Sequence, residues 1–569
     1  MKISGAQIVI KLLEREGITK IPGIPGGAIL PLYDALVDSH IEHVLARHEQ
    51  GAGFIAQGIA RVSGQAAVCM ASSGPGATNL ITTVADAKMD SIPLVVITAQ
   101  VPQELIGTDA FQEADTFGLM LPITKHNFLV SSAAELLEVI PESFRLACEG
   151  RPGPVSIDIP KDVLMEVIEI KRLPEITRNQ LSKIKPPPHQ VEAIYSMIKD
   201  SKQPVLMIGG GVIHASCSQQ ILCFAEKENI PIVASFMGLG AVPDSHPLFL
   251  GMLGMHAAPY TNLILEECDL LIGAGVRFDD RATGRVDAFC PNAKVIHIDI
   301  DESELGKIKK ASLAIRADIG ETISALVEKY SSPIDCTDSN KLRTPWLERV
   351  KTLKEDYPLD KNSDSSSAVE DLFTPYGLLE FLSKNIDENA TIVTDVGQHQ
   401  MWTAQAFPFN RPRQWISSGG LGTMGFGLPA AIGAAMVQPE RQVVCITGDG
   451  SIMMNIQELD TAAEHGLNIK IIVMNNENLG LVRQQQNLFY GGRITATQNR
   501  RQLNFAKLAE AMGVKGLDLG MSQDPQRLLV EALQQPGCHL INVPIEEDVK
   551  VFPMVPPGAA NKDMIGVSS

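Results

Sequence analysis

The feature that most constrains the fold of this chain is a set of short, almost wholly apolar runs that recur along its length, with helix-like segments between them. Such runs, bounded by glycine or polar residues, are typical of strands in parallel sheets that helices cover on both faces. The runs occupy residues 68–70, 94–97, 155–159, 205–208, 270–272, 295–298, 443–446 and 471–474. The pattern predicts an α/β protein with three doubly wound parallel-sheet domains.

Two segments rich in proline, serine or charge separate the three groups of predicted strands. They cover 173–190 and 331–369, and composition of this kind is typical of linkers between domains. The length of 569 residues has room for several domains of roughly 150 residues each. We therefore expect an N-terminal domain over 1–172, a central domain over 190–330, a C-terminal domain over 370–550 and a tail over 551–569.

The composition narrows the classes of function. Acidic residues outnumber basic ones by 66 to 48, and the net charge of −18 argues against binding to nucleic acid or to an anionic membrane surface. No stretch reaches the roughly 18 consecutive apolar residues that a membrane span needs. The nine cysteines form no C-x-x-C pair, which argues against a disulfide framework or structural zinc and fits a reducing, cytoplasmic location.

A glycine-rich turn in the last block carries the strongest chemical signal. Gly448-Asp449-Gly450-Ser451 follows one predicted strand, and Asn475-Asn476 ends the next. Open α/β sheets bind ligands at the carboxyl ends of strands, where glycines let the backbone approach a diphosphate. A carboxylate and a carboxamide oxygen also suit Mg²⁺. A Gly-Asp-Gly sequence alone is more often a simple tight turn, but the two motifs together indicate a magnesium–diphosphate site.

Two further features admit more than one interpretation. Glu49 lies between a strand-like segment, 44–46, and an apolar helix, so it is either a functional carboxylate or one that only stabilises the positive end of the helix. The stretch 68–76 is similar to 444–450, because both pass from a strand into a glycine-rich turn. That likeness reflects either a duplicated domain or chance.

Over essentially its whole length the chain resembles thiamine diphosphate enzymes, and in particular the catalytic (large) subunits of acetolactate synthases. Besides the two motifs above, the matching stretches are 25–28, 47–52, 73–79, 107–113, 150–154, 277–281, 397–400 and 420–425. The resemblance implies a pyrimidine-binding N-terminal domain, a central FAD-binding, Rossmann-like domain and a C-terminal domain that binds the diphosphate and Mg²⁺. It also implies a homodimer or dimer of dimers with sites between subunits, and a separate small regulatory subunit.

The same resemblance implies roles for individual residues. Glu49 would exchange a proton with the aminopyrimidine ring, Met424 would support the cofactor from beneath, and Gln112, Lys161 and Arg281 complete the implied catalytic set. The implied contacts to thiamine diphosphate are Glu49, Pro75, Asn79, Gly397, Gln398, His399, Gly422, Met424, Gly448, Asp449, Gly450, Ser451 and Asn476. The implied Mg²⁺ ligands are Asp449, Asn476 and Asn478.

The implied substrate pocket contains one departure from the family's pattern. Arg281 matches the arginine that grips the carboxylate of the second 2-oxo acid with two hydrogen bonds, although it could instead pair with Asp279 or Asp280. Gln485 stands where many members carry tryptophan, as in a variant isozyme that discriminates weakly. We therefore expect little preference for 2-oxobutanoate over pyruvate as the second substrate. The other wall residues that match are Phe111, Gln112, Lys161 and Met255.

The central block carries a run of three glycines after a predicted strand, which alone is weak evidence for a dinucleotide. The resemblance implies FAD without a net redox role. Its implied contacts are Arg151, Gly209, Gly210, Gly211, His256, Gly275, Arg277, Asp279, Arg281, Asp299 and Asp318.

Three activities are compatible with these motifs. The first is carboligation, in which pyruvate loses CO₂ and its two-carbon unit joins a second 2-oxo acid, as in branched-chain amino acid biosynthesis. The second is a pyruvate oxidase or decarboxylase reaction, and the third is a non-enzymatic regulatory or scaffolding subunit. Arg281 together with Lys161 favours carboligation, and the presence of Glu49, Asp449 and Asn476 argues against an inactive subunit.

Overall fold

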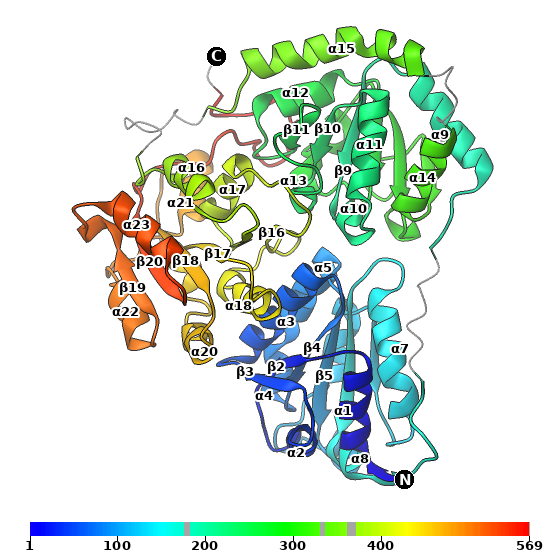
Figure 1. Ribbon diagram of the computed structural model, residues 1–569, viewed down its shortest axis with the longest axis vertical. Coiled ribbons are helices and arrows are strands. Elements are labelled where there is room, and N and C mark those ends of the chain that lie inside the picture. Colours follow the sequence, from blue (N-terminus) through cyan, green and yellow to red (C-terminus); the bar gives the residue numbers. More distant parts are fainter. Residues whose placement is uncertain (176–182, 330–335, 361–370, 568–569) are drawn as a thin grey trace.

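The computed structural model describes residues 1–175, 183–329, 336–360 and 371–567. Three lobes follow one another along the chain, each built around its own sheet with helices on both faces (Figure 1). Each of these sheets has six strands, and all their pairings are parallel. The predicted fold class is thus confirmed. Parts of both predicted linkers, at 176–182, 330–335 and 361–370, lie outside the described residues.

The N-terminal sheet contains the first three predicted strands, and every residue of these strands is buried because helices cover both faces. Its strand order is β3(Glu42–Leu45), β2(Lys20–Gly23), β4(Ala67–Ala71), β5(Leu94–Gln100), β7(Pro154–Pro160) and β6(His126–Leu129). Its helices are α1(Gly5–Arg15), α2(Leu30–Leu36), α3(Glu49–Ser63), α4(Pro75–Asn79), α5(Ile81–Asp90), α6(Thr116–Met120), α7(Leu136–Cys148) and α8(Lys161–Met165). A small antiparallel pair joins β1(Lys2–Ser4) to β8(Val167–Glu169).

The central sheet has the order of a dinucleotide-binding fold. The order is β11(Phe249–Met252), β10(Ile232–Ala234), β9(Pro204–Ile208), β12(Leu270–Ala274), β13(Lys294–Asp299) and β14(Leu313–Arg316). The chain reverses its winding between β9 and β12, and such switch points are where open α/β sheets bind ligands. The helices are α9(Pro188–Asp200), α10(Gly210–His214), α11(Ser218–Glu228), α12(Pro259–Glu267), α13(Asp280–Thr283) and α14(Ile319–Lys329).

The C-terminal sheet repeats the topology of the N-terminal one. Its order is β16(Trp415–Ile416), β15(Thr391–Thr394), β17(Val443–Gly448), β18(Ile469–Asn475), β20(His539–Pro544) and β19(Lys515–Asp518). Strands β4 and β17 take the same place in the two sheets, so the similar stretches 68–76 and 444–450 are equivalent, which favours duplication over chance. The helices are α16(Pro375–Asn385), α17(Gln398–Ala406), α18(Gly427–Val437), α19(Asp449–Ile452), α20(Glu458–Glu464), α21(Gly480–Phe489), α22(Phe505–Ala511) and α23(Pro525–Gln534).

The N- and C-terminal domains pack together along α3 and α18. Glycines allow the two backbones to touch, since a Cβ on Gly58 would lie 2.1 Å from the Ala430 carbonyl oxygen. A Cβ on Gly433 would likewise lie 2.0 Å from the carbonyl oxygen of Ile55. Apolar side chains of both helices share one buried cluster. This contact holds the two related sheets in a defined relative position.

The prediction that 331–369 is a linker was wrong for its middle part, which forms helix α15(Cys336–Asp356) along the central domain (Figure 1). Trp346, Val350 and Leu353 are buried on one face of this helix, and the Trp346 indole donates to the Pro204 carbonyl at 3.1 Å. Arg343 forms a buried ion pair with Glu228 at 2.9 Å. The few apolar residues of this stretch recur at helical spacing, but its charged composition obscured that signal.

The C-terminal residues 551–567, predicted as a separate tail, pack back onto the central domain. The Val555 amide donates to the Met255 carbonyl at 2.9 Å, and the Arg285 amide donates to the Ala559 carbonyl at 2.9 Å. Val551, Val555 and Ala560 are buried. Residues distant in sequence therefore complete one wall of the central domain.

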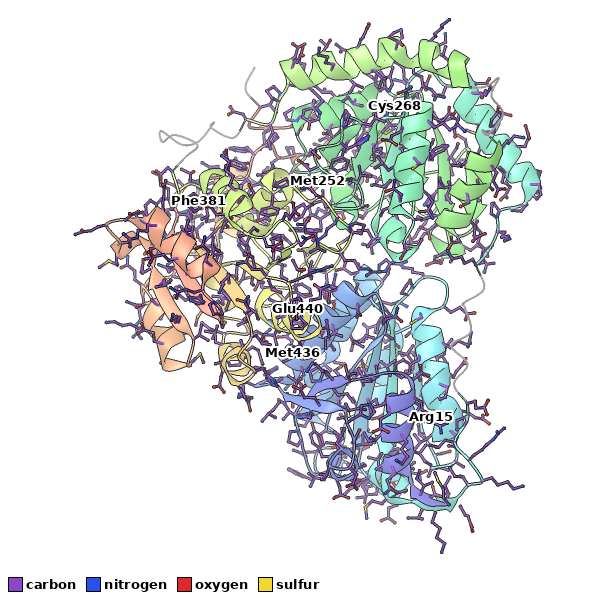
Figure 2. The ribbon with its side chains drawn as sticks, in the orientation of Figure 1. Arg15, Met252, Cys268, Phe381, Met436 and Glu440 are labelled. Carbon is purple, nitrogen blue, oxygen red and sulfur yellow. The ribbon has the colours of Figure 1, made fainter. Side chains whose placement is uncertain are left out.

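The side chains fill each lobe, with Arg15 in the N-terminal lobe, Cys268 in the central lobe and Phe381 in the C-terminal lobe (Figure 2). Eight cysteines are described, and all are free. Among the helices in the described ranges, none combines the length and the apolar character that crossing a bilayer requires.

Candidate functional site

A large cavity lies where the three domains meet, at the switch point of the central sheet. Its volume is about 1500 Å³, whereas typical small-molecule pockets measure roughly 300–1,000 Å³. The cavity can therefore take a ligand of dinucleotide size and still leave space beside it. The predicted FAD contacts that line it are Arg151, Gly210, Gly211, His256, Gly275, Arg277, Asp279, Arg281, Asp299 and Asp318.

Crossed glycine turns form the floor of this cavity. A Cβ on Gly209 would lie 2.1 Å from the Gly275 carbonyl oxygen, and a Cβ on Gly211 would lie 2.7 Å from the Gly275 Cα. Gly275 itself has φ 61°, in the left-handed region that favours glycine. The turn after β9 and the turn after β12 thus touch through their backbones. This cradle, open above the carboxyl ends of the strands, fits the phosphates of a dinucleotide.

Charged side chains around the cavity are held by the chain itself. The Arg151 guanidinium lies 2.6 Å from Glu304 and 3.2 Å from Asp301. Asp299, at the end of β13, is buried, and burial raises the pKa of its carboxyl to about 6. Because this carboxyl has little contact with water, it suits the hydroxyl donors of a ligand. Burial lowers the pKa of His256 to about 4, so its ring is neutral at physiological pH.

Arg281 stays accessible at the wall of the cavity. Its Nε atom lies 3.7 Å from an Asp280 carboxylate oxygen, and both side chains are more than half exposed, so this ion pair is weak. Its guanidinium also lies 3.7 Å from the Met255 sulfur. Met255, Gln485 and Gly422 line the same cavity. The structure therefore places three of the predicted second-substrate residues beside the predicted FAD set.

The Gly-Asp-Gly turn and the Asn-Asn motif meet at the carboxyl edge of the C-terminal sheet, where β17 and β18 are neighbours. Asp449 is only 3% exposed, and burial raises its pKa to about 6. The carboxylate accepts a hydrogen bond from the Asn499 amide at 2.7 Å. A buried carboxylate whose charged form is disfavoured in this way is stabilised by a bound cation. The residues present therefore fit Mg²⁺.

The three predicted magnesium ligands are not equivalent. The Asn476 amide donates to Gln398 Oε1 at 3.0 Å, and its oxygen accepts from the Asn478 backbone N–H at 3.1 Å. The Asn478 side-chain oxygen accepts from Arg483 at 3.2 Å instead, and its amide donates to the Asn476 carbonyl at 2.8 Å. The Asn478 side chain therefore bonds to the chain's own groups through both its oxygen and its nitrogen, and its backbone carbonyl offers a further oxygen. Gln398 likewise orients Asn476.

His399 presents an unsatisfied nitrogen beside the glycine turn. The residue is 4% exposed, its Nε2 has no hydrogen-bond partner among the described residues, and burial lowers its pKa to about 3. Its ring packs so closely on the turn that a Cβ on Gly448 would lie 2.8 Å from Nδ1. A buried ring nitrogen without a partner usually has a ligand or water to bind. That position fits a phosphate oxygen.

Asp395 belongs to the site but was missed in the sequence. It is fully buried at the end of β15 and accepts hydrogen bonds at 2.8 Å from the Val396 and Gly425 amides. Burial raises its pKa to about 6. The Gly425 amide directly follows Met424, so Asp395 orients the turn that carries this residue. An acidic residue that immediately follows an apolar strand was the signal available in the sequence.

Glu49 lies at the corresponding edge of the N-terminal sheet. It begins α3, and its Oε2 accepts a hydrogen bond from the Asn79 amide at 2.9 Å. A Cβ on Gly76 would lie 3.4 Å from its other oxygen. Burial and the nearby Glu49 carboxylate raise the pKa of Tyr33. The buried Ser72 hydroxyl of the same edge has no partner in the described part of the chain. Glu49 therefore begins α3 and also belongs to a cluster of polar side chains at this sheet edge, together with Asn79, Tyr33 and Ser72.

The predicted wall residues Phe111, Gln112 and Lys161 lie on this N-terminal edge. The Glu113 carboxylate accepts backbone N–H bonds at 3.2 Å from Thr108 and Ala110, which shapes the loop before it. Gln112 has φ 59°, and its carbonyl would lie 2.7 Å from a Cβ on Gly74. The Phe111 side chain is 88% exposed. Lys161 follows β7 at the start of α8.

The structure thus divides the predicted residues into two sets. The first set lies on the N-terminal sheet edge and does not line the large cavity; it consists of Glu49, Pro75, Asn79, Phe111, Gln112 and Lys161. The second set belongs to the central and C-terminal domains, except for Arg151, which lies in the N-terminal domain and lines the large cavity. Neither set alone contains both the predicted proton-transfer residue, Glu49, and the predicted magnesium ligands Asp449 and Asn476.

Known protein families and proteins match all three domains of the chain. Three family models match in order: "Thiamine pyrophosphate enzyme, N-terminal TPP binding domain" at 3–119, the central domain at 191–326 and the C-terminal TPP binding domain at 395–543. The chain is 52% identical to the acetolactate synthase isozyme 1 large subunit of Escherichia coli, covering 99% of this chain and 98% of that protein.

Two further relatives agree with this match. The isozyme 2 large subunit of Escherichia coli is 43% identical, with 99% of each chain covered. A probable acetolactate synthase large subunit of Methanocaldococcus jannaschii is 44% identical, with 98% of this chain and 94% of that protein covered. The chain therefore belongs to the acetolactate synthase large-subunit family of thiamine diphosphate enzymes.

Proposed function

We propose that the chain performs acetolactate synthesis with the residues assembled above: pyruvate loses CO₂, and the remaining two-carbon unit joins a second 2-oxo acid. Pyruvate as acceptor yields 2-acetolactate, and 2-oxobutanoate yields 2-aceto-2-hydroxybutanoate. The observation that carries the assignment of residues is the open guanidinium of Arg281 beside a dinucleotide-sized cavity, in a chain that also keeps the Glu49–Asn79 pair.

Glu49 is the proposed proton-transfer group. Thiamine diphosphate, when bound, would take up the electron pair left by the loss of CO₂ and make it available for the new carbon–carbon bond to the second substrate. The Asn79 amide holds one Glu49 oxygen, which leaves the other free to give or take a proton. Gln112 and Lys161, on the same edge, are proposed to contact the substrate.

The C-terminal edge is the proposed holding site for the diphosphate and Mg²⁺. Asp449 and Asn476 would offer oxygen ligands to the metal, and His399, whose Nε2 has no partner in the described residues, would bind the diphosphate together with the backbone of 448–451. Met424, in the turn oriented by Asp395, supports the cofactor. These groups bind and orient, while proton transfer belongs to the N-terminal edge.

The cavity wall is proposed to select the second 2-oxo acid. Arg281 binds its carboxylate through parallel N–H donors, and Met255 and Gln485 contact its alkyl group. The glycine cradle with Arg151, Asp299 and Asp318 holds FAD, as is typical of the family. FAD occupies this site without a net redox change in the proposed reaction.

We further infer that two copies of the chain complete one site. Glu49 of one subunit would face Asp449 of the other, which accounts for the N-terminal set not lining the large cavity of its own chain. The exposed Phe111 would then contact the partner subunit. The proposed domains are 1–172, 190–330 extended by α15, and 370–550, with a tail after them. A small regulatory subunit is expected as a further partner.

One product analysis tests the proposed reaction. The purified chain receives pyruvate, Mg²⁺ and thiamine diphosphate, with and without FAD, and the products are separated and identified. Acetolactate is the expected main product. Acetaldehyde as the main product would instead identify a decarboxylase, and acetyl derivatives with peroxide would identify an oxidase; either result would overturn the proposal.

A further inference from the structure

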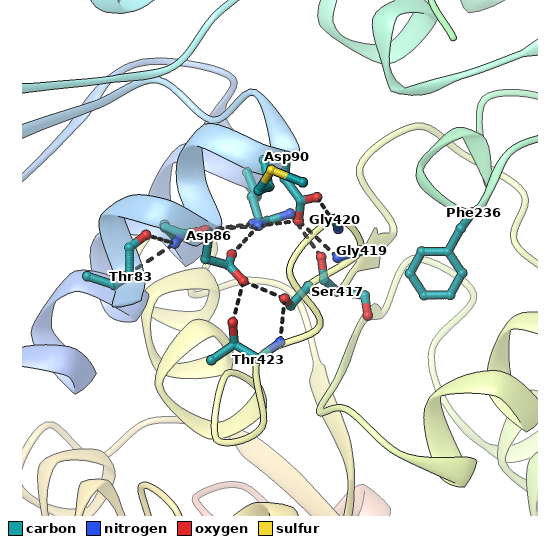
Figure 3. Close-up of polar contacts among 12 residues, drawn as sticks. Thr83, Asp86, Asp90, Phe236, Ser417, Gly419, Gly420 and Thr423 are labelled. Atoms are coloured by element: carbon teal, nitrogen blue, oxygen red, sulfur yellow. Dashed lines mark hydrogen bonds and ion pairs between the residues drawn. The ribbon is translucent and has the colours of Figure 1, made fainter. Parts of the chain in front are cut away.

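All three domains meet at the carboxyl end of α5, on the rim of the large cavity. Arg277 of the central domain donates to the Met89 carbonyl at 2.7 Å, and Arg151 donates to the Ser91 hydroxyl at 2.8 Å. Between these two contacts, Asp90 directs its carboxylate toward the C-terminal domain (Figure 3). Met89, Asp90 and Ser91 are outside the sets of residues predicted from the sequence, whereas Arg151 and Arg277 were predicted to contact FAD.

The carboxylates of α5 hold the loop that precedes Met424. The two oxygens of Asp90 accept the backbone N–H groups of Gly419 and Gly420 at 3.0 and 2.7 Å. One oxygen of Asp86 accepts the hydroxyls of Ser418 and Thr423, the latter at 2.9 Å (Figure 3). Every residue from 418 to 420, and Thr423, is therefore bonded to one helix of another domain.

Arg61 of α3 joins the two carboxylates. Its Nη2 atom lies 3.1 Å from Asp86 and 2.8 Å from Asp90, and its Nη1 atom donates to the Ser417 carbonyl at 2.9 Å. All three charged side chains are at most 6% exposed. Burial, and secondly the charge of Asp90, raise the pKa of Asp86 to about 6. Buried charges are costly unless they are paired, so this cluster is rigid only while every partner is in place.

The loop packs tightly against α5 at Gly420. A Cβ on Gly420 would lie 2.8 Å from the Met89 Cβ and 3.0 Å from an Asp90 oxygen. Immediately after it, Gly422 lines the cavity and Met424 lies in the turn oriented by Asp395. A displacement at 419–420 therefore moves residues of the proposed cofactor site.

We propose that Arg61, Asp86 and Asp90 form a clamp whose task is to position residues 417–424, so that Gly422 and Met424 are held ready for thiamine diphosphate. The clamp residues are positioning residues that act through the loop. Their role deepens the proposed function and depends on it for the identity of the cofactor.

The two carboxylates differ in a way that gives the test its signature. The partners of Asp90 on the loop are backbone N–H groups, which can only donate hydrogen bonds. In Asp90→Asn, the side-chain NH₂ group would therefore lie opposite one of these N–H groups, and no hydrogen bond could form between the two donors. The partners of Asp86 are hydroxyls, which can turn and accept a hydrogen bond from an amide. Asp90→Asn should therefore disturb the loop much more than Asp86→Asn, although both remove one charge next to Arg61.

The experiment compares the full-length protein with Asp90→Asn, Asp86→Asn and a matched control, Glu228→Gln. Glu228 also pairs with a buried arginine, Arg343, but in the central domain and without a bond to residues 417–424. Hydrogen–deuterium exchange of peptides covering 417–424 is measured without cofactor. The apparent dissociation constant of thiamine diphosphate with Mg²⁺ and the kcat and KM for pyruvate are measured separately.

Asp90→Asn should speed exchange in 417–424, raise the thiamine diphosphate dissociation constant about tenfold and lower kcat up to about 10²-fold, the loss that a misplacement of about 1 Å can cause. Asp86→Asn should show smaller effects in the same direction, and Glu228→Gln should leave loop exchange and cofactor affinity unchanged. If Asp90→Asn does not fold, Gly420→Ala, which pushes the loop off the clamp without altering a charge, should reproduce its effects.

Unchanged exchange in 417–424, equal effects of the two aspartate variants, or the same loss of cofactor affinity in Glu228→Gln would overturn the clamp. Exchange and cofactor binding are measured without pyruvate. Their outcome is therefore independent of the product analysis that tests the reaction itself.

Discussion

The N-terminal and C-terminal domains have the same strand order but carry different chemistry at equivalent positions. After β4 the chain turns through Ser73 and Gly74 into α4, whose Asn79 holds the Glu49 carboxylate. After β17 it turns through Gly448 and Asp449, and the turn itself supplies the carboxylate. The shared topology places both groups at the carboxyl edge of a sheet, whereas the residues at that edge decide what is bound.

The surroundings of the two carboxylates support the different roles proposed for them. Asp449 is buried beside glycines and an amide, with its pKa raised to about 6, which suits a site completed by a cation. Glu49 is only partly buried in a single chain and is held by one amide donor, which leaves an oxygen open to a ligand. In the proposed function, one edge binds the metal and the diphosphate, and the other edge transfers the proton.

The largest expected effect comes from the N-terminal edge. Glu49→Gln keeps the size of the side chain and can still bond to Asn79 but cannot carry the proton, so kcat should fall by about 10²–10⁴-fold. Steady-state kinetics measure the loss, and thiamine diphosphate binding should change little. Glu138→Gln, an exposed change on α7 of the same domain, is the control. Activity of Glu49→Gln near that of the control would remove Glu49 from its proposed role.

Mixing two inactive variants tests whether the two edges come from different subunits. Glu49→Gln and Asp449→Asn, dissociated and reassembled together, should give mixed dimers with one intact site each. Random pairing then restores about a quarter of the activity of the unmodified protein, because half of the dimers are mixed and half of their sites are intact. Activity assays before and after mixing measure the recovery. No recovery, despite mixed dimers detected by differential tagging, would show that each site lies within one chain.

The pH dependence of magnesium binding sharpens the contrast at the C-terminal edge. In the proposed site, only the deprotonated Asp449 carboxylate would bind the metal, and the pKa of Asp449 is raised to about 6 by burial. The apparent affinity for Mg²⁺ should therefore be constant above this pH and fall about tenfold per pH unit below it. Titration with Mg²⁺ at constant thiamine diphosphate, followed by intrinsic fluorescence between about pH 5 and 7.5, measures this. Asp449→Asn should bind weakly and lose the slope; a slope retained in that variant would assign it to another group.

The smallest effect concerns substrate choice at the cavity wall. The unmodified protein should show little preference for 2-oxobutanoate over pyruvate, because Gln485 lacks the apolar surface of tryptophan. Gln485→Trp should raise the preference about tenfold, within the roughly 1–3 kcal/mol available from one apolar contact. Competition assays with both acceptors provide the ratio. A preference of tens-fold in the unmodified protein would contradict the assignment of this position.

The local signals in the sequence predicted a large part of the fold. The apolar runs at 68–70 and 443–446 could be predicted as strands, because a strand that is buried on both faces needs apolar residues at consecutive positions. The turn at 448–451 was recognisable because Gly-Asp-Gly follows one such strand and Asn475-Asn476 ends the next, which predicts that both motifs lie at the same edge of a sheet. Glu49 and Asn476 each follow or end an apolar, strand-like run in the sequence, and the structure has both at carboxyl edges of sheets.

Other features depended on contacts between residues far apart in the chain. The position of helix α15 depends on contacts with the central domain, such as the hydrogen bond from Trp346 to the Pro204 carbonyl. The packing of 551–567 on that domain likewise depends on contacts such as the hydrogen bond from the Val555 amide to the Met255 carbonyl. Asp90 reads in the sequence as an ordinary polar residue at the end of a helix. Its partners on the loop, Gly419 and Gly420, lie more than three hundred positions away, so docking of the domains alone decides that it holds the loop before Met424. Periodicity is a local property of a chain, whereas the pairing of a buried charge is set by what packs against it.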